Sequence, residues 1–141
     1  ALPEDLVGES AAVLGFGLFR KRGTATTDWL GLSGPAGRSR IGRWIEENVD
    51  PARIVARADS FLVLRELAAA GLGLAGMPDF IGAEHPGLER VTGVLPDLAV
   101  DIWVASHSDL AEIPRIAAAR SLLTQAVAEQ AARLRGETEA A

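Results

Sequence analysis

The sequence predicts an α/β fold, because apolar runs with the length of buried strands alternate with segments of helical periodicity. Two runs carry most of this prediction: residues 12–19 (AVLGFGLF) and residues 100–105 (VDIWVA). Near-continuous apolar runs are typical of strands that are covered on both faces. Between these two runs, turn residues separate shorter strands from helices that have one apolar side.

The first half of the chain contains three expected strands and one helix. The strands cover residues 12–19, 29–32 and 53–58. Ile41, Trp44 and Ile45 lie at positions i, i+3 and i+4, which predicts a helix with one apolar face from residue 38 onward. Pro51 marks the end of this helix, because the residue before a proline is disfavoured in helical conformation.

The second half adds two helices and three strands. Ser60 is the expected N-cap of the first helix, and Gly71 is placed to adopt the left-handed conformation at its end. Pro114 begins the last helix, where its missing N–H costs nothing. The strands cover residues 72–77, 88–91 and 100–105. The last helix is expected to face the core through Ile116, Ala119, Leu123, Ala126 and Val127.

Composition limits the possible functions. A chain of 141 residues with 48% hydrophobic content can form one domain with a real core. Its net charge of −5 argues against nucleic-acid binding by this chain alone, since phosphate neutralisation needs a basic face. The absence of cysteine excludes disulfides and thiolate metal sites and fits the cytoplasm. The sequence has no apolar run of about 18 residues for a membrane span, and its first residues do not resemble a signal peptide.

Three apparent chemical motifs do not predict an enzyme, a cofactor or a metal site. Residues 71–76 (GLGLAG) match G-x-G-x-x-G, but a dinucleotide motif follows a strand and opens a helix, whereas this one follows a helix. Residues 106–109 (SHSD) are adjacent, while a catalytic triad needs side chains that converge from separate elements. His85 and His107 each lack the second histidine or paired carboxylates of a metal site. Roles in capping and in loops are expected for these residues.

A basic cluster leaves three interpretations open. It comprises Arg20, Lys21, Arg22, Arg38, Arg40 and Arg43, with Trp29 and Trp44 nearby. The cluster could bind nucleic acid, form a solvated helix face and strand-end turn, or serve a small anion. The loop at residues 33–37 (SGPAG) leaves a strand and enters a helix, so its N–H groups and the helix dipole would favour a carboxylate.

The order of elements resembles the effector-binding domain of LysR-type transcriptional regulators over about residues 5–134. The most specific parts are residues 68–80 (AAAGLGLAGMPDF), the helix start at residues 58–60 (ADS) and residues 101–118 (DIWVASHSDLAEIPRIAA). The resemblance implies a periplasmic-binding-protein type II-like, two-lobe Rossmann-like fold, present here as a fragment. In such domains two crossing strands join two α/β lobes, and the effector lies in the cleft between them.

The resemblance implies three parts. Residues 1–22 would form the end of the first lobe and the first crossing strand, residues 23–95 the second lobe, and residues 96–141 the second crossing strand and the closing helix of the first lobe. The early first lobe and the N-terminal winged helix-turn-helix are missing. Since open α/β sheets bind ligands at the carboxyl ends of strands, the expected ligand contacts are Ser33, Gly34, Ser60, Phe61, Met77 and Pro78.

By this resemblance the chain senses a small, anionic metabolite and transmits the signal to a helix-turn-helix. The implied partners are the effector, further copies in a homodimer or homotetramer, and DNA only through the missing N-terminal domain, in the cytoplasm and without a cofactor. One alternative is a stand-alone solute-binding protein, which a secretion signal in the gene would distinguish. Another is an enzyme on a similar scaffold, which would need converging acids or bases that the sequence does not show.

Three further expectations concern the isolated chain. Residues 12–19 and 100–105 should be neighbouring antiparallel strands that link the lobes. The acidic chain should not bind duplex DNA at physiological salt. It should self-associate through the face with Ile116, Leu123 and Val127, because large apolar patches rarely stay exposed on a soluble monomer.

Overall fold

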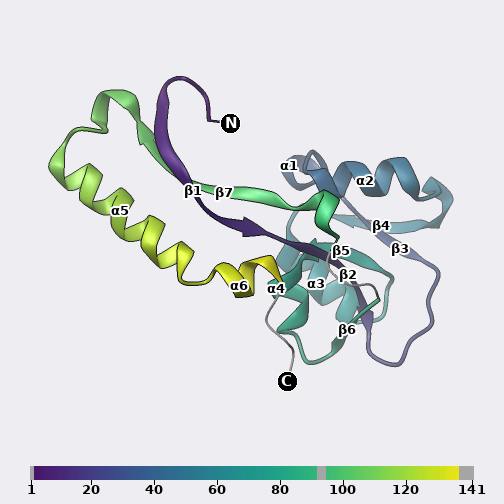
Figure 1. Ribbon diagram of the computed structural model, residues 1–141. Coiled ribbons are helices and arrows are strands. Elements are labelled where there is room, and N and C mark those ends of the chain that lie inside the picture. Colours follow the sequence, from purple (N-terminus) through teal and green to yellow (C-terminus); the bar gives the residue numbers. More distant parts are fainter. Residues whose placement is uncertain (1, 92–94, 137–141) are drawn as a thin grey trace.

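The computed structural model describes residues 2–91 and 95–136, and a long antiparallel ribbon runs through it (Figure 1). Strand β1 (Leu6–Leu14) pairs with β7 (Val100–His107) in a register that places Leu14 opposite Val100. The predicted antiparallel pairing is confirmed, but the predicted extent of the first strand is wrong. β1 begins at Leu6 rather than at residue 12, and residues 16–19 belong to another sheet.

Gly15 separates β1 from β2 (Phe16–Lys21). Its N–H donates to the carbonyl of Leu134 at 2.8 Å, and its own carbonyl accepts from the N–H of Asp79 at 2.8 Å. Because both groups bond outside the ribbon, pairing with β7 stops here and β2 joins a different sheet. The apolar run continues through Gly15 because the residues on both sides of this change are shielded from solvent.

Five short strands build the sheet of the compact lobe: β2, β3 (Trp29–Leu32), β4 (Ile54–Ala58), β5 (Ala75–Pro78) and β6 (Leu88–Arg90). β2 lies between β5 and β6 and is antiparallel to both, whereas β3 and β4 are parallel. A parallel bridge between Trp29 and Leu74 connects β3 to the chain entering β5. The carboxyl ends of β3, β4 and β5 therefore lie at one edge of the lobe.

Helices cover both faces of this sheet. α1 (Gly34–Gly37) and α2 (Arg40–Asn48) lie on one face, and α3 (Phe61–Ala69) and α4 (Asp79–Ala83) lie on the other (Figure 1). A Cβ added at Gly76 of β5 would lie 2.7 Å from Cγ1 of Ile41, so glycine lets α2 approach the strand closely. Full burial marks the core side chains Phe19, Leu30, Ile41, Ile45, Leu64 and Met77.

Most predicted elements are present with shifted ends. The strand expected at residues 72–77 is β5 at Ala75–Pro78, and β4 begins after a 3₁₀ turn at Pro51–Arg53. The helix expected from residue 38 divides into α1 and α2, because Ser39 caps α2 by accepting a hydrogen bond from the N–H of Gly42. Further 3₁₀ turns lie at Pro96–Leu98 and Ser108–Leu110.

The ribbon carries two C-terminal helices, α5 (Pro114–Ala128) and α6 (Ala131–Arg135), along one face. Pro114 begins α5 as predicted, but the expected core-facing stripe is wrong within this chain. Ile116 and Val127 are half-buried, whereas Ala119, Leu123 and Ala126 are exposed. The helix meets β7 partly through a polar contact, in which Arg120 donates to the hydroxyl of Ser106 at 2.6 Å, so its apolar residues do not gather on one buried side.

Ser60 is confirmed as the N-cap of α3. Its hydroxyl accepts hydrogen bonds from the N–H groups of Leu62 at 3.2 Å and Val63 at 3.5 Å. Gly71 ends the helix with φ +90°, the left-handed conformation that favours glycine. These two residues explain why α3 begins and ends where the sequence indicates.

We expect Ser60→Ala to lower the free energy of unfolding by about 1 kcal/mol, because alanine leaves those N–H groups without their acceptor. Urea denaturation followed by tryptophan fluorescence would measure the change. Ser121→Ala, at an exposed position inside α5, is the matched control and should have almost no effect. Equal stability of the two variants would contradict a capping role for Ser60.

Candidate functional site

Three loops that follow parallel strands meet at one edge of the lobe. The N–H of Ser33, after β3, donates to the carbonyl of Ala58 at the end of β4 at 2.9 Å. A Cβ added at Gly34 would lie 3.5 Å from the Cβ of Asp59, the residue before Ser60. The structure therefore places the Ser33–Gly34 segment directly beside the start of α3.

An aromatic contact joins this region to the end of β5. The ring of Phe61 packs edge-on against the ring of Phe16, with centroids 6.2 Å apart. Phe16 lies opposite Pro78 in the antiparallel pairing of β2 with β5. A continuous series of contacts thus connects the three strand ends that the sequence selected, and we call Ser33, Gly34, Ser60, Phe61 and Pro78 the strand-end cluster.

The members of the strand-end cluster differ in what they can offer a ligand. Ser33, Ser60 and Phe61 are half-buried, Gly34 is exposed and Pro78 is buried. Ser33 lies at the N-cap of α1 without a side-chain cap hydrogen bond, so its hydroxyl is not used by that helix. Met77, also selected from the sequence, is fully buried in the core and presents no side-chain surface. Alternate residues of a strand point to opposite faces, and Met77 points into the lobe.

A buried ion pair supports this edge from below. Nε and Nη2 of Arg90 in β6 donate to the two carboxylate oxygens of Asp79 at 2.8 and 2.6 Å. The Asp79 side chain is only 1% exposed, and its hydrogen bond raises the pKa of Arg90. Sequence reasoning missed this pair, since Asp79 and Arg90 become neighbours only when α4 returns to β6. The available signal was a carboxylate directly after a buried strand and its proline.

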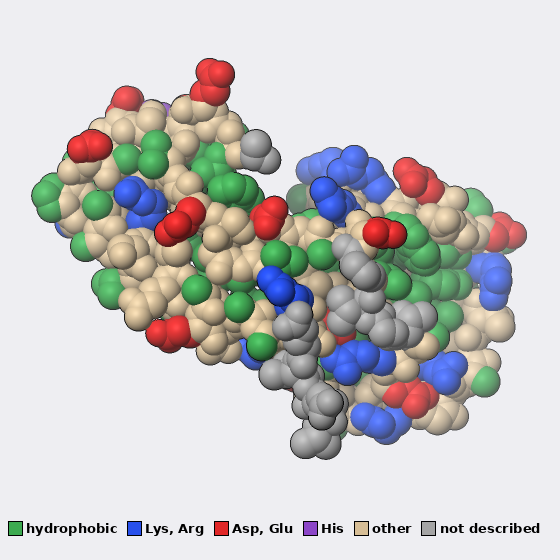
Figure 2. Space-filling view, in the orientation of Figure 1, with side chains coloured by type: hydrophobic (Ala, Val, Ile, Leu, Met, Phe, Trp, Pro, Cys, Tyr) green, Lys and Arg blue, Asp and Glu red, His purple; other side chains and the backbone are tan. Residues whose placement is uncertain are grey.

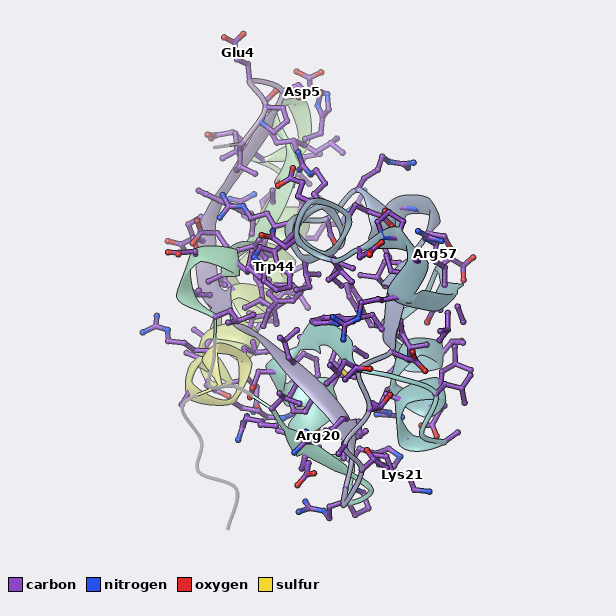
Figure 3. The ribbon with its side chains drawn as sticks, turned by 90° about the vertical axis from the view of Figure 1, so that its right-hand side faces the viewer. Glu4, Asp5, Arg20, Lys21, Trp44 and Arg57 are labelled. Atoms are coloured by element: carbon purple, nitrogen blue, oxygen red, sulfur yellow. The ribbon has the colours of Figure 1, made fainter. Side chains whose placement is uncertain are left out.

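The basic cluster is divided by the fold. Arg20 pairs with Glu89 at 3.1 Å and Arg22 donates to the carbonyl of Pro86, both near the end of β2. Figure 3 shows Arg20 and Lys21 at that end of the lobe, away from Trp44 in α2. The remaining basic residues, Arg38, Arg40 and Arg43, are exposed around α1 and the start of α2, where basic side chains gather in Figure 2. The cluster is therefore two separate groups.

The other motifs have structural roles in the described residues. Residues 71–76 follow α3 and lead into β5, so they do not open a helix. Nδ1 of His107 accepts from the N–H of Asp109 at 3.1 Å, and Nδ1 of His85 accepts from the N–H of Gly87 at 3.0 Å, both within turns. Within residues 2–91 and 95–136, no group of three or more His, Asp or Glu side chains is arranged to hold a metal ion. None of the helices described is both long and apolar enough to cross a membrane.

Comparisons with known proteins agree with this arrangement. Residues 22–128 match the sequence profile of the LysR substrate binding domain. The regulatory domain of MexT, a transcriptional activator in Pseudomonas aeruginosa, superposes with a TM-score of 0.63 and 16% identity over 88% of this chain and 67% of that one. The effector binding domain of QuiR in complex with shikimate gives 0.65 and 13% identity over 92% and 70%. No curated protein sequence matches the chain.

Larger regulators contain the same fold. Full-length CbnR complexed with its target DNA gives a TM-score of 0.62 and 16% identity, covering 92% of this chain and 50% of that one. This chain spans only 46% of two other similar regulators, VV2_1132 and PA0477 from Pseudomonas aeruginosa.

The fold is that of a ligand-binding α/β domain of the periplasmic-binding-protein type II kind. The chain belongs to the LysR substrate-binding domain family.

Proposed function

We propose that this chain is the effector-sensing part of a DNA-binding transcriptional regulator, and that the strand-end cluster forms one wall of its effector site. In this proposal residues 1–22 and 96–141 contribute the crossing strands and part of a first lobe, and residues 23–95 form the second lobe. The observation that carries the proposal is the convergence of three strand ends at one edge, since open α/β sheets bind ligands there.

The charges near this edge favour a small anion. Arg38, Arg40 and Arg43 follow the Ser33–Gly34 loop and are exposed. In the described part of the chain, none of these three arginines lies within ion-pair distance of a carboxylate, and Arg40 donates instead to the carbonyl of Ala99 at 3.0 Å. A carboxylate on the effector would supply a charge-assisted hydrogen-bond partner. The QuiR complex with shikimate shows that a domain of this fold can hold a small molecule.

Calorimetric titration with a panel of small carboxylates would test the proposal. We expect one member to bind and Ser33→Ala to weaken that binding by about tenfold, which corresponds to the loss of one hydrogen bond. Ser121→Ala on α5 should bind like the unaltered chain. If binding survives Ser33→Ala, Arg40→Ala and Phe61→Ala alike, the strand-end cluster is not the site.

Binding to DNA belongs to the parent protein in this proposal. The isolated chain, with a net charge of −5, should not shift a DNA duplex at physiological salt in a gel experiment. Salt-sensitive binding at micromolar concentration would instead assign a nucleic-acid role to the basic residues of this chain.

A further inference from the structure

Helix α6 makes a contact that crosses from the ribbon to the compact lobe. The guanidinium of Arg133 in α6 forms a two-point ion pair with the carboxylate of Glu84, which follows α4, and Nη2 is 2.8 Å from Oε2. The same guanidinium lies over the ring of Phe80 in α4, 5.0 Å from its centroid. One side chain thus combines an ion pair and a cation–π contact with α4 and its C-terminal end.

The backbone reinforces this contact at the junction of β1 and β2. The carbonyl of Leu134, the residue after Arg133, accepts from the N–H of Gly15. The carbonyl of Gly15 accepts in turn from the N–H of Asp79, the first residue of α4. Gly15, where the chain passes from the ribbon into the lobe, is therefore held by α6 on one side and by α4 on the other.

We propose that this contact of Arg133 with Glu84 and Phe80 is a latch that sets the angle between the ribbon with its helices and the compact lobe. Besides the latch, the described residues join these two bodies mainly through the strand junctions at Gly15 and before β7 (Figure 1). A two-stranded connection by itself leaves the lobes free to turn about it, as in hinge-bending proteins.

The strength of the latch suits reversible motion. The side chains of Arg133 and Glu84 are 42% and 50% exposed, so the ion pair is weak and is screened by salt. The hydrogen bond from Arg133 also lowers the pKa of Glu84, which keeps this carboxylate ionised at neutral pH. α4 begins directly after Pro78, so an effector at the strand-end cluster would act on the latch through α4. That last link rests on the proposed function, while the latch itself does not.

Distances between two spin labels would test the latch without any effector. The chain contains no cysteine, so Glu47→Cys in α2 and Leu122→Cys in α5 give two specific, exposed attachment sites. Dilution with unlabelled chain removes distances between copies. The distance distribution of this pair is then compared with those of Arg133→Gln, Glu84→Gln and the charge-swapped variant Arg133→Glu with Glu84→Arg. Arg115→Gln, at the far end of α5, is the matched control.

We expect one narrow distribution for the parent chain and for Arg115→Gln, and a broader or displaced one for Arg133→Gln and Glu84→Gln. The charge-swapped variant should return toward the parent distribution, and 1 M salt, where the Debye length is about 3 Å, should broaden the parent. Unchanged distributions in both single variants, with unchanged circular dichroism, would overturn the proposal. A charge-swapped variant as broad as the single variants would also overturn it. Effector titration decides the proposed function separately.

Discussion

Replacing Arg90 with methionine should destabilise the chain by about 3–5 kcal/mol, the largest loss that we expect from one substitution outside the apolar core. The side chain of Asp79 is 1% exposed, and Arg90 donates to both of its carboxylate oxygens. Methionine preserves much of the volume and removes both donors, so a carboxylate shielded from water loses its counter-charge. Urea denaturation followed by tryptophan fluorescence would measure this loss.

The double variant Asp79→Asn with Arg90→Met separates the cost of the unpaired charge from the value of the contact itself. Because asparagine is neutral, the double variant should be more stable than Arg90→Met alone. The opposite order, or a loss below about 1 kcal/mol for the single variant, would show that water reaches Asp79 and that the pair contributes no more than a surface ion pair.

The second large effect should follow from Phe19→Ala, with an expected loss of about 3–5 kcal/mol. Phe19 is 0% exposed and lies in β2, the central strand of the lobe. Its ring occupies the space beside Gly82 of α4, where a Cβ would come within 2.5 Å of Cδ2 of Phe19. Truncation to alanine removes the ring and leaves a cavity between the sheet and α4. Urea denaturation would measure this loss as well.

Two controls make this prediction specific. Phe19→Leu should cost much less than Phe19→Ala, since leucine refills most of the cavity. Leu122→Ala, at a side chain that is 68% exposed, should change stability by no more than about 0.5 kcal/mol. Equal losses for Phe19→Ala and Leu122→Ala would contradict the placement of Phe19 at the centre of the core.

The local signals in the sequence located most elements of the lobe. Ser60 and Gly71 act through their own side chain and φ angle, so the start and end of α3 could be predicted without knowledge of the rest of the fold. The spacing of Ile41 and Ile45 likewise identified the buried face of α2, because it depends only on helical geometry. Four of the five members of the strand-end cluster lie in loops after strands, where residue types and turns carry the information.

Predictions that depended on which segments become neighbours were less accurate. Met77 was selected with Pro78 as a ligand contact, but the direction of its side chain depends on the pleat of β5 against β2. The stripe on α5 was expected to face a core, while the described ribbon meets that helix through Arg120 and half-buried residues.

The sequence by itself determined the α/β class, the capped helices and the strand ends at which a ligand is expected, because those features follow from local conformational preferences and from periodicity. Only the tertiary structure decided that pairing with β7 stops at Gly15, that Arg90 neutralises Asp79, and that Arg133 reaches Glu84 and Phe80. Each of these contacts joins groups far apart in the chain. Hydrogen-bond registers and ion pairs between distant segments form only when the packing of the whole domain brings the groups within a few ångströms, and local propensity carries no record of that packing.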